Sequence, residues 1–228
     1  MGRVSSFTSA VVLATLSVAV LATGASAQRT PVTTAPRTTI PTVSPQAGTY
    51  PVLQQADLPN GYQMSSGTPQ RRTGFSASYP TIDKCIWNPS NPFSGLTPVV
   101  YSSLFSRTSE DNGLETLWEF DDATPAKAFY GNLEKAYTAA TKCKVVKQPS
   151  SAGSSSTFDI GTFSKIDAAT LGDESLVVAL EPASKLQPAT KYAFFRVGSS
   201  VAAMRITDDS INAKEFTALA KTAAKRAG

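Results

Sequence analysis

Apolar and polar residues alternate in several short runs after residue 50, which is the pattern of β-strands that bury one face. In chain order, this pattern predicts strands at residues 61–64, 99–105, 114–120, 158–165, 175–180, 192–197 and 201–206. Two tight turns support the pairing of neighbouring strands. We expect one at Asp111-Asn112-Gly113 and the other at Gly198-Ser199-Ser200, because both have the composition of hairpin turns.

Two other segments have the period of an α-helix, with apolar residues at every third or fourth position. The first is predicted to start at Thr124 as N-cap, with Pro125 as its first helical residue, and to run to about Lys142. In the second, Asn212 and Glu215 have the spacing of a capping box that begins a terminal helix. The apolar positions of the two helices are Phe129, Leu133, Ala136, Tyr137 and Ala140, and Phe216, Leu219, Ala220 and Ala223.

The segments between these elements are rich in Gly, Pro, Ser and Asn. We expect mostly irregular chain at residues 65–98, a polar loop at 148–156 and a short helical turn within 51–59. The order of strands, helix, strands and helix predicts an α+β fold. In this fold a twisted antiparallel sheet of about six strands is packed by two main helices.

The first 49 residues differ from the rest of the chain. Arg3 precedes an apolar run at 10–22 and an Ala-x-Ala ending at Ala27, which together predict a signal peptide at residues 1–27. An uncleaved anchor helix is the alternative, and it is disfavoured because Thr and Ser interrupt the run. Residues 28–49 are rich in Thr and Pro and predict a disordered tether that is open to O-glycosylation. Residues 50–228 are long enough for one domain, and no later segment is apolar enough to predict a transmembrane span.

The charge of the chain bears on its possible partners, and its cysteine content bears on the compartment in which it works. The chain has 21 basic and 17 acidic residues, and removal of residues 1–27 takes away one arginine. This weak positive charge disfavours nucleic acid as a partner. The two cysteines, Cys85 and Cys143, are expected to form a disulfide in an exported chain.

The chain contains no histidine, which excludes a Ser-His-Asp triad, a Cys-His pair and a histidine-ligated zinc. Nucleotide-binding, serine-nucleophile and calcium-loop motifs are absent as well. We therefore predict no catalytic, cofactor-binding or metal-binding residue, no cofactor, and no enzymatic activity. Paired carboxylates leave a histidine-free glycoside hydrolase as an alternative. The candidates Glu119, Asp121, Asp122, Asp173 and Glu174 are better explained by a helix start and a turn.

Four residues are candidates for a ligand cleft. Arg196 and Arg205 lie on neighbouring predicted strands, where they can receive an anion or pair with Glu174 or Glu181. The aromatic candidates are Trp87, Tyr101 and Trp118. Trp118 shares a strand face with Leu114 and Phe120, so a core role is favoured for it, and Trp87 and Tyr101 remain cleft candidates.

Several short motifs also resemble a known family. They are Ala56-Asp57-Leu58-Pro59-Asn60-Gly61-Tyr62, Cys85, Cys143 after a helix, Leu171-Gly172-Asp173-Glu174-Ser175-Leu176, and the segment from Tyr192 to Val201. With these motifs the chain resembles the actinobacterial extracellular sensor-domain family, related to the outer domain of a mycobacterial receptor Ser/Thr kinase. The resemblance implies an antiparallel sheet flanked by helices, with a cleft for an unidentified small molecule of the envelope. One cysteine pair stands where kinase-linked members are expected to have two.

These observations predict an exported, non-catalytic, sensor-like domain that is secreted or associated with the cell envelope. Its expected partner is an unknown small molecule or a cell-envelope component. A structural or protein-interaction module at the cell surface is the alternative, favoured if the domain has no enclosed pocket but an exposed apolar patch.

Overall fold

The computed structural model describes residues 50–93, 96–151 and 154–228. The predicted signal peptide and tether lie outside these described residues. The elements, in chain order, are η1 Gln55–Asp57, β1 Gln63–Met64, β2 Gln70–Arg72, β3 Ser78–Asp83, β4 Ile86–Pro92, β5 Val99–Ser106, β6 Asn112–Glu119, α1 Ala123–Ala140, β7 Val146–Pro149, β8 Thr157–Lys165, β9 Glu174–Pro182, β10 Thr190–Val197, β11 Ser200–Thr207 and α2 Ala213–Ala227.

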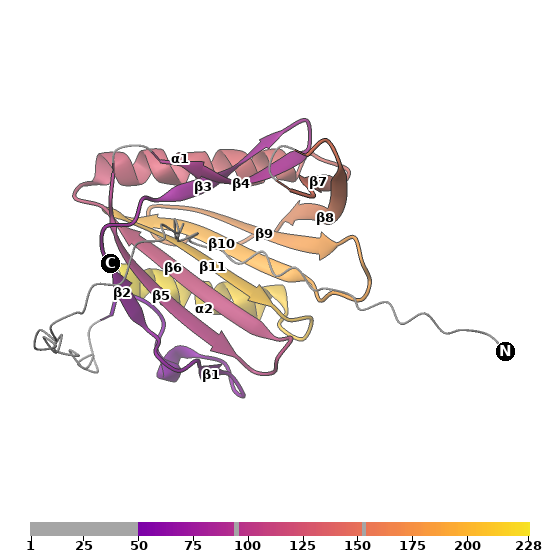
Figure 1. The fold of residues 1–228 in the computed structure, drawn as a ribbon. Coiled ribbons are helices and arrows are strands. Elements are labelled where there is room, and N and C mark those ends of the chain that lie inside the picture. Colours follow the sequence, from indigo (N-terminus) through magenta and orange to yellow (C-terminus); the bar gives the residue numbers. More distant parts are fainter. Residues whose placement is uncertain (1–49, 94–95, 152–153) are drawn as a thin grey trace, which may run out of the picture. The chain divides into compact units, whose positions relative to one another are not determined.

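The strands form two hydrogen-bonded groups. One has the order β1-β5-β6-β11-β10, with β2 also paired to β5, and the other has the order β3-β4-β7-β8-β9. The two groups meet where β9 lies beside β10 (Figure 1). The α+β class is confirmed, but the prediction of about six strands is wrong because the sheet is larger. It is also mixed rather than wholly antiparallel, since β4 and β7 pair in parallel at Ile86 and Lys147.

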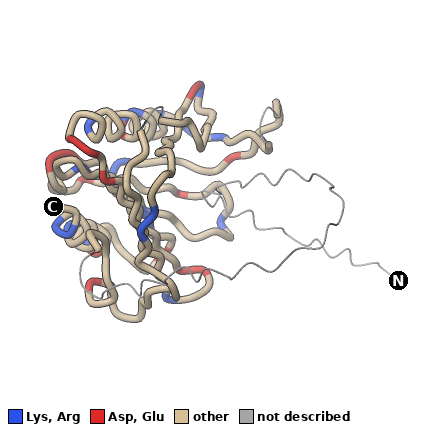
Figure 2. Tube along the Cα trace, turned by 60° about the vertical axis from the view of Figure 1, so that its left-hand side comes forward, with Lys and Arg blue, Asp and Glu red and all other residues tan. Residues whose placement is uncertain are grey.

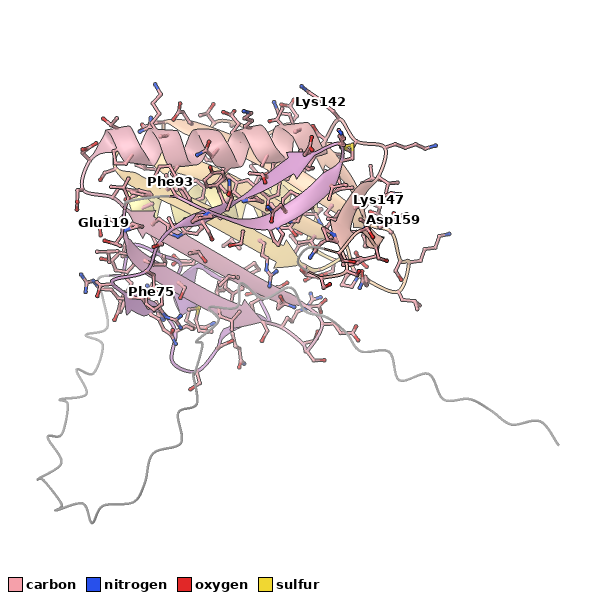
Figure 3. The ribbon with its side chains drawn as sticks, turned by 45° about the horizontal axis from the view of Figure 1, so that its top comes forward. Phe75, Phe93, Glu119, Lys142, Lys147 and Asp159 are labelled. Atoms are coloured by element: carbon pink, nitrogen blue, oxygen red, sulfur yellow. A yellow bond between two sulfur atoms is a disulfide. The ribbon has the colours of Figure 1, made fainter. Side chains whose placement is uncertain are left out.

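The prediction of irregular chain at 65–98 missed β2, β3 and β4. Asn, Pro and Ser make up most of β4, so its composition has little strand propensity. It becomes a strand through its pairing with β3, around a tight turn in which Lys84 and Cys85 have positive φ. The disulfide between Cys85 and Cys143 is confirmed, and it fixes this turn to the chain just after α1. Directly after β4, Phe93 packs under α1 against Phe129 (Figure 3).

The helix boundaries follow their capping side chains. The N-cap of α1 is Asp122, whose carboxylate accepts from the Thr124 N–H at 2.6 Å, so the prediction of Thr124 as N-cap is wrong by two residues. A carboxylate is favoured over a hydroxyl there because it also complements the positive helix end. The capping box of α2 is confirmed, with Asn212 and Glu215 each bonded to the other's backbone N–H.

A glycine in β6 corrects the predicted turn at 111–113. The connection between β5 and β6 is residues 107–111, and Asn112 and Gly113 already belong to the strand. Gly113 lies opposite Phe105, and the Phe105 ring occupies the space that a β-carbon at residue 113 would need. Gly113 is therefore required for packing and not for a turn.

The two helices pack on opposite sides of the central strands (Figure 1). Because side chains alternate along a strand, β10 sends Ala193 and Phe195 to the α2 side and Phe194 to the α1 side. The α1 side is an aromatic core, in which Trp118 contacts Phe129 at a ring-centroid distance of 5.2 Å. The expected core role of Trp118 agrees with this position.

The segment before η1 docks on the α2 side through polar side chains. The buried Leu53 N–H donates to Glu115 Oε2 at 2.7 Å, and the Ser103 hydroxyl donates to the Leu53 carbonyl at 2.8 Å. We call these two hydrogen bonds the clamp on Leu53. Next to it, Arg226 near the end of α2 forms an ion pair with Asp57. Two side chains thus replace the strand that would otherwise satisfy the Leu53 backbone.

Candidate binding face

The two sides of β5, β6 and β11 differ in their exposure. On the α2 side, the middle of these strands is fully buried, as at Phe105, Glu115, Leu117 and Met204, while Tyr101 and Glu119 towards one end keep some exposure. On the α1 side, more of the residues remain partly accessible; six of them form two neighbouring rows, and one of the six, Leu104, is 40 % exposed. We call these six residues the open face: Ser102, Leu104, Leu114, Thr116, Ala203 and Arg205. They are open because α1 packs at the other end of this side, over Trp118 and Val201.

Strand register arranges the open face in two rows. Tyr192 lies opposite Arg205, Arg205 opposite Leu114, and Leu114 opposite Leu104, across β10, β11, β6 and β5. The second row, one pleat closer to α1, is Phe194, Ala203, Thr116 and Ser102. Directly opposite residues on one face are in contact range. The first row is therefore polar at one end, with a phenol and a guanidinium, and apolar at the other, with two leucines.

Arg205 differs from three other arginines of the domain. Arg107, Arg196 and Arg226 each form an ion pair with a carboxylate. Within the described part of the chain, the Arg205 side chain has neither an ion pair nor a hydrogen bond, although its Nε is buried. A guanidinium that loses hydration without gaining an acceptor is costly, and such a group is available to a ligand.

Two tyrosines stand beside Arg205. Tyr192 is its cross-strand partner, and the Tyr137 ring from α1 lies 5.6 Å from the Tyr192 ring. Burial raises the pKa of both phenols, while the nearby charge of Arg205 lowers it by a smaller amount. Both hydroxyls are therefore protonated at neutral pH and can donate hydrogen bonds. None of the described ion pairs joins a carboxylate to Arg205, so its positive charge is not neutralised by a direct partner there.

The four predicted cleft residues do not come together. Arg196 is bound by Glu174 at 2.6 Å and Asp173 at 2.9 Å, at the opposite end of its strand from Tyr192. Tyr101 lies on the α2 side, where its hydroxyl donates to Glu119 at 3.1 Å. Trp87 and Arg205 are both on the α1 side. The Trp87 ring stacks on Phe163 and meets the edge of Tyr137.

Sequence reasoning assigned Tyr137 to the apolar face of its helix and did not single out Tyr192. Both are largely buried, so they do belong to the core as expected. The signal that could have marked them is the hydroxyl, since neither phenol makes a side-chain hydrogen bond among the described residues. The phenol oxygen that is buried without a partner is that of Tyr130, also on α1. Their position next to Arg205 depends on strand register, which periodicity does not give.

The remaining carboxylate candidates have structural partners. Asp122 caps α1, Glu119 accepts from Tyr101, and Asp173 and Glu174 hold Arg196. The described residues contain no group of three or more acidic or cysteine side chains arranged to hold a metal ion. Charged residues of both signs are interspersed along the described trace (Figure 2).

Two shallow hollows lie away from the open face. The first, of about 440 Å³, is at the start of α1 and includes Arg196, whose guanidinium is already occupied by carboxylates. The second, of about 300 Å³, lies between the β5–β6 connection and residues 185–188. The second is bordered by charges of both signs, including Arg107, Asp111 and Lys185. Neither hollow presents an unpaired buried charge, so we take the open face as the candidate site.

Comparison with solved structures gives one informative likeness. The chain matches the extracellular domain of PknH from Mycobacterium tuberculosis, with a TM-score of 0.56 and 15 % sequence identity over 77 % of this chain and 92 % of that one. The two share a fold. This confirms the resemblance predicted from the sequence motifs. The sequence matches no known family model and no curated protein.

The described part of the chain contains no helix that is both long and apolar enough to span a lipid bilayer.

Proposed function

We propose that residues 50–228 form a non-catalytic binding module that works outside the cytoplasm and takes a small molecule or a cell-envelope component on the open face. The unequal exposure of the two sheet sides carries this proposal. The middle of one side is covered by α2 and by the segment around Leu53, whereas the other side leaves an unpaired arginine and two leucines accessible. The disulfide and the fold shared with an extracellular domain support an oxidising location.

Native mass spectrometry of the protein purified from its own host tests the proposal. We expect a co-purifying mass that is lost on mild denaturation. Thr116→Trp, which fills the centre of the open face, should remove this mass. Lys214→Trp, an equally large change on the exposed side of α2, should retain it.

Two results would overturn the proposal. One is a wild-type protein without any co-purifying mass. The other is a mass that survives Thr116→Trp in a folded variant. Either result would favour the alternative of a surface-interaction module, since the accessible Leu104 would then be explained by contact with another protein.

A further inference from the structure

The polar end of the open face has the donors of an oxyanion site. Arg205 offers N–H groups in a planar fork, and Tyr137 and Tyr192 add two hydroxyls that stay protonated. No described carboxylate forms an ion pair with Arg205. A bound anion would supply the acceptor that the buried Arg205 Nε lacks.

The charge balance favours one kind of anion. The site carries a single positive charge, so a monoanionic carboxylate neutralises it. A phosphate monoester would bring about 1.5 to 2 negative charges and leave an excess in a partly buried place. The flat carboxylate also matches the guanidinium fork.

The rest of the row is apolar. Leu114 and then Leu104 follow Arg205 across neighbouring strands, which lie about 4.8 Å apart. An apolar chain that leaves a carboxylate at Arg205 and crosses β6 and β5 would cover both leucines. It would also explain why a side chain as large as Leu104 is 40 % exposed on this face.

Resting on the proposed function, we infer that the ligand of the open face is a single-chain amphiphilic carboxylate. Its head group is held by Arg205, Tyr192 and Tyr137, and its apolar body lies on Leu114 and Leu104. Arg205 supplies the charge selectivity, and the two leucines supply the preference for an apolar chain.

Titration calorimetry with sodium dodecanoate, below its micelle concentration, tests the inference. Dodecanoate should bind, dodecyltrimethylammonium should not, and acetate should bind far more weakly. Arg205→Gln should weaken dodecanoate binding by about 10- to 100-fold, as expected for a charge-assisted hydrogen bond. Arg71→Gln removes an exposed arginine from β2 and should leave the affinity unchanged.

Tyr192→Phe removes only a hydroxyl and serves if Arg205→Gln does not fold; it should weaken binding by about 5-fold. Leu104→Asn should reduce the affinity for dodecanoate without changing that for acetate.

Equal binding of the ammonium probe, tighter binding of dodecyl phosphate, or no effect of Arg205→Gln and Tyr192→Phe would overturn the inference. A neutral co-purifying mass would overturn it too, while leaving the proposed function intact. Loss of the proposed function would show instead as a wild-type protein that carries no ligand from its host.

Discussion

Replacing Glu115 with glutamine is expected to remove a pH dependence from the stability of the domain. Glu115 is fully buried, and burial raises the pKa of its carboxyl from the ordinary 4.5 to about 8, against the opposing effect of the Leu53 N–H. Between these values the unfolded chain has lost a proton that the folded chain keeps. Stability therefore falls as pH rises, by about 1.4 kcal/mol per pH unit, or on the order of 4 kcal/mol from pH 5 to 8.

Urea denaturation of the wild type and Glu115→Gln at pH 5, 6, 7 and 8 measures this effect as a difference, so that other titrating groups cancel. The wild type and Glu115→Gln should have similar unfolding free energies at pH 5. At each higher pH, Glu115→Gln should become more stable relative to the wild type. Ser103→Ala removes the other side chain that holds Leu53 but does not titrate, and it should cost about 1 kcal/mol at every pH. A difference between wild type and Glu115→Gln that stays constant with pH would refute the reasoning.

Further substitutions test the packing and the disulfide described above. Gly113→Ala should destabilise the domain by about 1 to 3 kcal/mol in urea denaturation, because its methyl group would overlap the Phe105 ring. Gly131→Ala, where a β-carbon meets nothing, should raise helix stability by up to about 1 kcal/mol, and an equal loss in both variants would contradict this account. Replacing Cys85 and Cys143 together with serine should lower the unfolding free energy by up to about 4 kcal/mol, since the bridge closes a loop with a sequence separation of 58; an unchanged thermal midpoint would argue against it.

The fold was predictable where side-chain pattern and pairing agree. In β11 the alternation of Met204 and Ile206 with accessible residues is visible in the sequence, and the strand was predicted nearly to its ends. In β4, proline and asparagine have low strand propensity, and the strand forms because β3 and the disulfide hold it in place. Such strands depend on distant contacts and leave no local signal.

The candidate site was predictable in part for a similar reason. Arg196 and Arg205 belong to the same hairpin, and local sequence does not distinguish them. What separates them is Glu174, which is 22 residues before Arg196 and pairs with it in the folded chain. Which of the two arginines stays available was therefore decided by tertiary contacts.

The clamp on Leu53 also determines how the domain is held. The described chain begins at Tyr50, which packs with the α2-side core against Tyr101. The open face is on the other side of the same strands. The described chain therefore enters the domain on the α2 side of these strands. A force applied at Tyr50 would act first on the hydrogen bonds that Glu115 and Ser103 make with Leu53, and not on the open face.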